Sequence, residues 1–309
     1  MTHRLPMATD GLDTIERLSR IRLIAIDIDG TLLEDPNAEV AEVLATLNAS
    51  LGHHLRRVTL TIATGRAFEG AQKVIQRLKL SRTTPVILYN GAVICDVDGG
   101  RLNCLHLLQM DEIYQVVTRV LEIGLSALVY QPKPYFSLRA DDSDPEPAIS
   151  EHVTGYSSVP GPASEFNGLP VEWRTSASVL PKDAAAIIVP TPFEGSNSLV
   201  SDLEKLCGAT VTKSSNAYLE IRPRAVNKGN ALSVVASGRS LTPEDVLAIG
   251  DNDNDIEMLD WAGCSVAVAN STSGAIQASD FVTEGTAGQG VVETLRLIYD
   301  ARRHQISRK

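Results

Sequence analysis

The chain has 309 residues, of which 43% are hydrophobic and 21% charged, and its formal net charge is −10. This length exceeds one compact core, so it predicts two domains or one domain with a large insertion. The acidic balance disfavours nucleic acid and anionic membrane surfaces as partners.

The sequence is expected to contain neither a membrane-spanning segment nor a secretion signal. No stretch approaches the roughly 18 apolar residues of a membrane span. The first 20 residues lack the apolar segment of a secretion signal and are expected to form a flexible or short helical extension. The four cysteines form no C-x-x-C pair, which favours a reduced, cytoplasmic protein without a disulfide framework or zinc site.

The first third of the chain alternates between buried strands and amphipathic helices. Strands are expected near residues 22–27, 58–63 and 85–89. The segments between them have helical periodicity, which is carried by Val40, Val43, Leu44, Leu47 and Leu51, and then by Val74, Ile75 and Leu78. This alternation predicts a parallel sheet wrapped by helices.

The pattern changes between residues 92 and 220 and then returns. This stretch has a predicted helix at 111–124 and short predicted strands at 93–95, 127–130, 135–139, 186–189 and 218–222. It indicates an inserted α+β domain with its own sheet. After Lys228 the parallel-sheet pattern resumes, with helices from residues 229, 255 and 291 and strands at 246–249 and 265–268. The predicted fold class is therefore α/β with an insertion.

Asp27 and Asp29 follow the first strand in the string RLIAIDIDGTLL, residues 22–33. Side chains alternate along a strand, so residues i and i+2 face the same way and the two carboxylates converge. Gly30 permits a sharp turn there, and Thr31 can cap the following segment. Converging carboxylates require a hard cation or a raised pKa as compensation. The alternative is an ordinary strand exit with solvated aspartates.

Two further clusters carry a hydroxyl and a cation. Thr64-Gly65-Arg66 follows the second strand, where a Thr hydroxyl and backbone N–H groups can form an anion cradle. The alternative is a plain helix cap by Thr64. Lys228, next to a helix start, can stabilise a phosphate or the Asp27 carboxylate. Its alternative is a solvated surface lysine.

The fourth cluster is the string GDNDND at residues 250–255, which follows the strand at 246–249. Three aspartates and two asparagines suit a Mg²⁺ site because hard cations prefer oxygen ligands. The alternative is a polar turn that caps the helix from Ile256. All four clusters lie at or next to the carboxyl ends of predicted parallel strands, or at helix starts that face this edge. Open α/β sheets bind ligands there.

These motifs read DIDGTLL, IATGRAF, YNGAVI, VNKGNAL and GDNDNDIEML. With them, the chain from about residue 21 resembles the haloacid dehalogenase-like (HAD) superfamily of phosphohydrolases, and specifically its Cof-type sugar-phosphatase branch. The resemblance implies a Rossmann-like core with helices on both faces, formed by residues 21–92 and 223–309. It further implies that residues 93–222 form an α+β cap domain over the active site. Residues 1–20 then form an N-terminal extension.

The resemblance also implies residue roles. Asp27 would be the nucleophile that forms an aspartyl-phosphate, and Asp29 would act as general acid and then general base. Mg²⁺ would be held by Asp27, the backbone carbonyl of Asp29 and Asp251. The remaining expected site residues are Thr64, Gly65, Arg66, Lys228 and Asn254 for phosphate or substrate, Asp255 as support for Lys228 or the metal ligands, and Asn90 and Gly91 as cleft-lining residues.

The expected function is therefore Mg²⁺-dependent hydrolysis of a small phosphorylated metabolite, with a sugar phosphate as the expected substrate. The enzyme is expected to be a cytoplasmic monomer or homodimer, with no nucleic-acid or membrane partner. Two alternatives remain open. One is a phosphomutase of the same fold, and the other is a regulatory module that binds phosphate without useful turnover. The sequence does not specify the phosphate ester.

Overall fold

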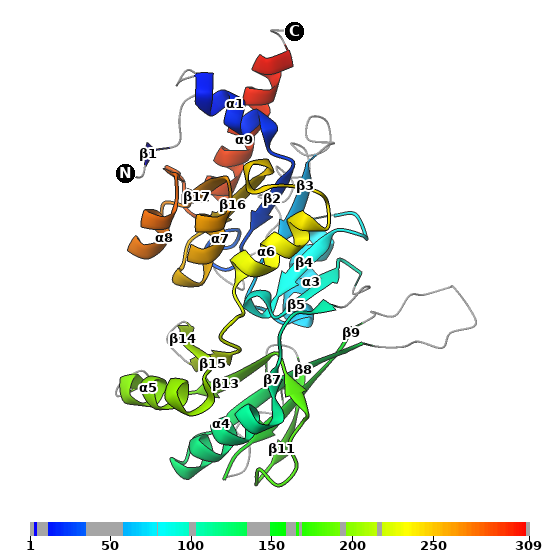
Figure 1. Cartoon of the computed structure of the whole chain (residues 1–309), viewed down its shortest axis with the longest axis vertical. Helices are drawn as coiled ribbons and strands as arrows, with labels where there is room; N and C mark the ends of the chain where they lie inside the picture. The colour runs from blue at the N-terminus through cyan, green and yellow to red at the C-terminus, as the bar shows by residue number, and fades with distance from the viewer. Residues whose placement is uncertain are drawn as a thin grey trace, which may run out of the picture. The chain divides into compact units, whose positions relative to one another are not determined.

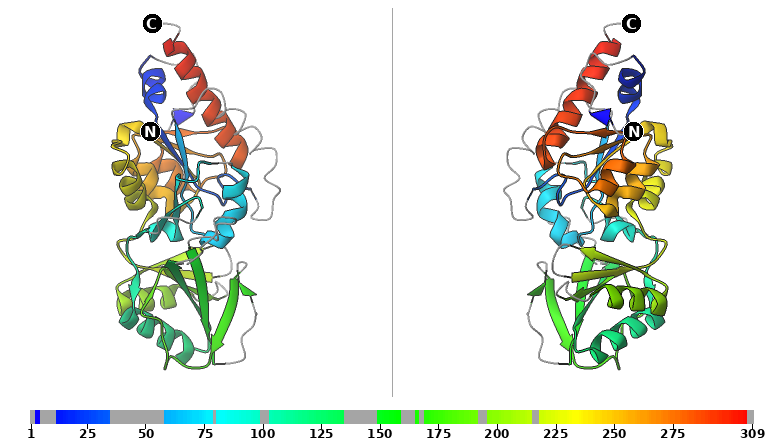
Figure 2. Two further views of the ribbon diagram at one scale, coloured as in Figure 1. Left: turned by 90° about the vertical axis from the view of Figure 1, so that its right-hand side faces the viewer. Right: turned by 90° about the vertical axis from the view of Figure 1, so that its left-hand side faces the viewer.

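Figure 1 and Figure 2 show the computed structural model of the chain. It describes residues 3–4, 12–34, 58–78, 80–98, 103–134, 149–158, 165–166, 169–191, 196–214 and 218–306. The predicted helix around residues 40–51 and the predicted strand at 135–139 lie outside these ranges.

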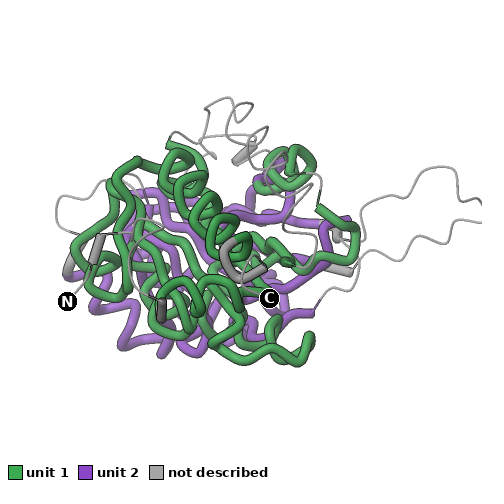
Figure 3. Tube along the Cα trace, turned by 90° about the horizontal axis from the view of Figure 1, so that it is seen from above, with its two compact units in different colours: residues 1–65, 71–91, 227–309 green, residues 66–70, 92–226 purple. Residues whose placement is uncertain are grey.

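The chain divides into two compact units, which Figure 3 colours green and purple. The first unit comprises residues 1–65, 71–91 and 227–309, and the second comprises residues 66–70 and 92–226. The second unit is therefore inserted into the first, and each is described separately below.

A six-stranded, all-parallel sheet forms the centre of the first unit. In spatial order its strands are β1 (His3–Arg4), β18 (Phe281–Val282), β17 (Cys264–Ala267), β16 (Val246–Gly250), β2 (Leu23–Ile26) and β3 (Thr59–Ile62). Every residue of β2, β16 and β17 is buried, as expected for parallel strands that are covered on both faces. β4 (Pro85–Leu88) adjoins β3 through a parallel bridge between Ala63 and Ile87.

Helices cover both faces of this sheet. In Figure 2, α6 (Lys228–Ser237) and α7 (Ile256–Trp261) lie on one face, and α9 (Ala287–Ile306) lies on the other. The other helical segments that the structure describes in the first unit are α1 (Leu12–Arg20), η2 (Pro243–Asp245), η3 (Asp253–Asp255), α8 (Ser273–Ala278), η1 (Tyr89–Gly91) and most of α3 (Phe68–Arg77).

The segment expected to be an N-terminal extension includes helix α1, which packs along α9 (Figure 1). Arg17 of α1 donates to the Gly263 carbonyl at 2.7 Å and to the Asp280 carboxylate at 2.5 Å. Arg302 of α9 donates to the Ile21 carbonyl. Helix α1 is therefore an integral part of the first unit.

The second unit contains a seven-stranded, mainly antiparallel sheet with two helices on one face. Its order is β10 (Glu165–Phe166), β11 (Leu169–Arg174), β9 (Ile149–Tyr156), β8 (Ala127–Pro134), β13 (Ala186–Pro190), β15 (Tyr218–Arg222) and β14 (Thr210–Ser214). β9 and β11 are parallel to each other. Alternate residues such as Val129, Ile187 and Ile221 form a buried core with α4 (Met110–Glu122) and α5 (Ser196–Cys207).

Two small antiparallel strand pairs are also described in the second unit. They are β5 (Val93–Asp96) with β6 (Asn103–Cys104), and β7 (Leu108–Gln109) with β12 (Asp183–Ala184). The predicted fold class, α/β with a parallel-sheet core and an inserted α+β unit, is confirmed. Among the helices that the structure describes, none is both long enough and apolar enough to cross a membrane.

Candidate active site

Asp27 and Asp251 follow two neighbouring strands of the parallel sheet, β2 and β16. The strands are in register with Ile26 beside Ile249, and the Asp27 backbone N–H donates to the Ile249 carbonyl at 3.1 Å. Because the carboxyl ends of parallel strands meet at one edge, the two carboxylates converge there. Asp27 is 4% exposed and Asp251 is 9% exposed, so the alternative of a solvated strand exit is wrong for Asp27.

The turn after Asp27 is shaped to accept the Asp251 carboxylate. Gly30 has φ +89°, and a Cβ at that position would lie 2.3 Å from Asp251 Oδ2. The Thr31 hydroxyl donates to Asp251 Oδ1 at 2.7 Å and is fully buried. Thr31 therefore orients a carboxylate 220 positions away, a role that its sequence interpretation as a local cap did not anticipate.

Lys228 is the first residue of α6, whose cap is the Asn227 side chain. Its ammonium donates to Asp27 Oδ1 and to Asp255 Oδ1, each at 2.6 Å. The lysine is fully buried, so the alternative of a solvated surface lysine is wrong. Charge-assisted hydrogen bonds of this length fix both carboxylates relative to α6.

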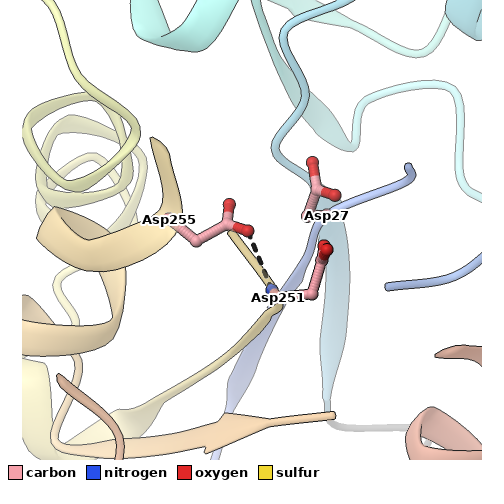
Figure 4. Close-up of side chains that lie close together, drawn as sticks. All are labelled: Asp27, Asp251 and Asp255. Carbon is pink, nitrogen blue, oxygen red and sulfur yellow. Dashed lines mark hydrogen bonds between the residues drawn. The ribbon is translucent and has the colours of Figure 1, made fainter. Parts of the chain in front are cut away.

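Asp255 connects the lysine to the turn that carries Asp251. Its Oδ2 accepts from the backbone N–H groups of Asp251 at 3.0 Å and Asn252 at 3.1 Å. Asn252 in turn accepts from the Asp253 N–H. The polar string therefore caps its own short helix and also presents carboxylates to Asp27. Figure 4 shows the side chains of Asp27, Asp251 and Asp255 close together, and its dashed line marks the bond from the Asp251 backbone N–H to Asp255.

Burial dominates the electrostatics of this cluster. Loss of hydration raises the pKa of Asp27 well above its ordinary value, even though Lys228 opposes the change. Burial also raises the pKa of Asp251 to about 6, against the hydrogen bond from Thr31. Burial alone would lower the pKa of Lys228, but Asp255 and Asp27 outweigh it and raise that pKa. Lys228 is therefore a buried cation that the carboxylates of Asp27 and Asp255 share.

The donor set fits a hard divalent cation. Asp27, Asp251 and Asp255 each offer a carboxylate oxygen, and these atoms lie within 4.8 Å of one another. Three carboxylates and one ammonium give a formal charge of −2 in a buried volume. A divalent cation would neutralise that charge, and oxygen is the ligand type that Mg²⁺ prefers.

Some of the residues that are expected to hold phosphate lie close to one another. Thr64 is fully buried, and helix α3 begins only at Phe68, so the alternative of Thr64 as its cap is wrong. The Thr64 carbonyl accepts from the Asn90 N–H at 3.0 Å, and Asn254 Nδ2 donates to Asn90 Oδ1 at 3.0 Å. Thr64 and Asn254 are thus linked through one residue, Asn90.

Asp29, Gly65 and Arg66 have different surroundings. Asp29 is half-buried and forms a bridge with Leu33. Gly65 lies against Asn90, because a Cβ on Gly65 would be 3.0 Å from Asn90 Nδ2. Arg66 belongs to the second unit, where its guanidinium donates to the Gly70 carbonyl at 2.9 Å.

Comparison with known proteins identifies this arrangement. Over residues 24–295 the chain matches the family model of haloacid dehalogenase-like hydrolases. It is 28% identical to YxeH of Bacillus subtilis (strain 168) over 282 residues, which cover 89% of this chain and 97% of that protein. It is 25% identical to YitU of the same strain, a 5-amino-6-(5-phospho-D-ribitylamino)uracil phosphatase, over 89% of this chain and 96% of that protein.

A solved haloacid dehalogenase-like hydrolase from Bacteroides thetaiotaomicron shares the fold. Its TM-score is 0.70 at 23% identity, and the match covers 90% of this chain and 99% of that one. The sequence resemblance is therefore confirmed: this chain belongs to the haloacid dehalogenase-like hydrolases.

Proposed function

We propose that this enzyme is a Mg²⁺-dependent phosphatase that hydrolyses a small phosphorylated metabolite, with sugar phosphates as the substrate class. The observation that carries the proposal is the pairing of buried Asp27 with Lys228 inside a cluster of net charge −2. YitU acts on a phosphorylated ribityl compound, which supports a phosphorylated polyol or sugar as substrate.

In the first step, a carboxylate oxygen of Asp27 attacks the phosphorus atom and the ester P–O bond breaks. Asp29 gives its proton to the departing alkoxide, and Asp27 then carries an aspartyl-phosphate. In the second step, Asp29 takes a proton from water as that water attacks phosphorus. Inorganic phosphate leaves and the Asp27 carboxylate is restored. The covalent intermediate divides one difficult hydrolysis into two easier steps.

The remaining site residues hold the substrate. Lys228 offsets charge on Asp27 and on the phosphoryl oxygens, while Thr64, Gly65 and Asn254 donate hydrogen bonds to phosphate. Arg66 is proposed to contact the organic part of the substrate.

Mg²⁺ would be held by the carboxylates of Asp27 and Asp251 and the backbone carbonyl of Asp29. When bound, it would supply positive charge at the transferring phosphoryl group.

The test is phosphate release from a panel of sugar and small-metabolite phosphates, with and without Mg²⁺. Wild type is compared with Asp27→Asn and with the control Asp260→Asn, which removes an exposed carboxylate from α7. We expect Mg²⁺-dependent release that Asp27→Asn abolishes and Asp260→Asn preserves. Release by Asp27→Asn near the wild-type rate would refute the nucleophile.

The same panel separates the two alternatives. A bisphosphate product formed from a sugar monophosphate after priming with an activated sugar bisphosphate would indicate a phosphomutase. Absence of release from every ester, with Mg²⁺ binding intact, would indicate the regulatory binding module.

A further inference from the structure

Three consecutive residues at the end of β4 have left-handed backbone conformations. Tyr89, Asn90 and Gly91 have φ values of +50°, +53° and +106°, and all three are buried. Such conformations cost roughly 1–2 kcal/mol for an ordinary L-residue, although Asn tolerates them better than Tyr. A buried run of this kind persists only when its surroundings determine it, and such conformations cluster at active sites and ligand-binding sites.

Asn90 makes the contacts that determine this turn. Its backbone N–H donates to the Thr64 carbonyl, its Oδ1 accepts from Asn254 Nδ2, and its amide lies against Gly65. Asn90 is 2% exposed. One residue therefore fixes the separation between the Thr64–Gly65 loop and the turn that carries Asn254.

Gly91 connects the same turn to the lysine. A Cβ at Gly91 would lie 2.3 Å from the backbone carbonyl of Asn227, the residue that caps α6 immediately before Lys228. The close approach and the positive φ together require glycine here. The turn consequently touches the segments that carry Thr64, Asn254 and Lys228.

We propose that Asn90 is a positioning residue that orients the Asn254 carboxamide for phosphate. This proposal rests on the proposed function, in which Asn254 contacts phosphate. An Asn amide nitrogen has two hydrogens, and the bond to Asn90 uses one of them. The rotation of the amide is thereby fixed, so its second hydrogen has one defined direction. A donor held in place in this way costs no reorganisation during the reaction.

The residue type follows from the geometry. Glycine would accept the φ of +53° but would provide no acceptor, and alanine would provide neither tolerance nor acceptor. Aspartate would keep the acceptor, but it would add a negative charge beside the proposed phosphate position. Asparagine meets the conformational, hydrogen-bonding and charge requirements together.

The test is a double-mutant cycle with Asn90→Gly and Asn254→Ala. Asn90→Gly tolerates the positive φ of this position and removes the side chain that accepts the hydrogen bond from Asn254. Two quantities are measured: kcat/KM for the best ester of the panel, and calorimetric binding of inorganic phosphate with Mg²⁺ present. We expect Asn90→Gly to lower kcat/KM roughly ten- to a hundredfold, as small misplacements of catalytic groups do. The double variant should lose no more than Asn254→Ala alone, because Asn90 acts through Asn254.

The control is Ser240→Gly, which also introduces glycine at a positive φ, +55°, but at an exposed position. It should leave both quantities unchanged. Unchanged kcat/KM and phosphate binding in Asn90→Gly, or losses that multiply in the double variant, would overturn the proposal.

A second variant covers failure of Asn90→Gly to fold. Asn90→Asp preserves the shape and the acceptor but adds a negative charge beside Asn254, so phosphate binding should weaken about tenfold. Unchanged binding would mean that position 90 does not influence the phosphate site, and it would overturn the proposal. Phosphate binding does not depend on turnover, so failure of the Asn90 proposal can be distinguished from failure of the proposed function. The second kind of failure is detected by the activity of Asp27→Asn.

Discussion

Replacing Lys228 with methionine should destabilise the first unit strongly. Methionine has a similar length and fills the buried volume, but it leaves Asp27 and Asp255 without the ammonium that each contacts at 2.6 Å. Removing one partner from a buried ion pair costs about 3–5 kcal/mol, because the remaining charge stays buried and uncompensated. For a domain of this size each kcal/mol shifts Tm by about 2–4 °C, so we expect Tm to fall by roughly 6–20 °C.

The assay is thermal unfolding in EDTA, so that metal binding does not mask the loss. Lys73→Met is the matched control, because Lys73 is an exposed residue of α3 and its replacement should change stability by less than about 0.5 kcal/mol.

The double variant Lys228→Met/Asp27→Asn tests the reason for the loss. It removes one of the two unpaired carboxylates and should be more stable than Lys228→Met alone. A Tm for Lys228→Met within 2 °C of wild type, or a double variant that is less stable still, would refute the electrostatic explanation.

Three further predictions concern the metal, the turn and a buried thiol. Mg²⁺ should raise Tm, by the equivalent of about 2.7 kcal/mol when present at a hundredfold its Kd, and EDTA should reverse the gain; an unchanged Tm at Mg²⁺ concentrations that support turnover would contradict the site. Gly30→Ala should lower kcat/KM about a hundredfold by displacing Asp251, whereas Gly124→Ala, with φ +75° and open space around it, should lose only stability. Burial raises the pKa of the Cys264 thiol to about 12, whereas the same thiol in the unfolded chain has a pKa of about 8.5. The free energy of unfolding is therefore unaffected below about pH 8.5 and falls as the pH rises above it, because only the unfolded thiol ionises there. Between pH 8 and 10 the free energy of unfolding of wild type, measured with urea, should therefore fall by about 2 kcal/mol more than that of Cys264→Ala. Equal decreases in the two proteins would show that ionisation of Cys264 does not affect stability.

The parallel core could be predicted because its signals are local. Strands such as Leu23–Ile26 and Val246–Gly250 are continuous apolar runs that end in polar turns, and such runs are typical of strands buried on both faces. The periodicity did not identify α8 (Ser273–Ala278) or β18 (Phe281–Val282), which are too short for a repeating pattern.

The contacts within the site are less visible in the sequence because they join distant positions. Thr31 stands in a turn in which capping is its commonest role, and nothing nearby indicates a bond to Asp251. Asn90 belongs to an Asn-Gly pair, which usually marks a turn, and its bond to Asn254 spans 164 positions. Local patterns indicate where side chains emerge, whereas packing decides which of them meet.

The three clustered carboxylates are not equivalent, and their hydrogen bonds separate their roles. Both carboxylate oxygens of Asp255 already accept hydrogen bonds, Oδ1 from Lys228 and Oδ2 from two backbone N–H groups. A metal bond to Asp255 would therefore have to compete with bonds that hold the lysine and the Asp251 turn. Asp27 and Asp251, by contrast, leave adjacent strands that the sheet holds in register. The sheet thus fixes the spacing of the two proposed metal ligands, while Asp255 and Lys228 fix their orientation. This division explains why a buried cluster with a net charge of −2 can stand ready for a cation that brings the opposite charge.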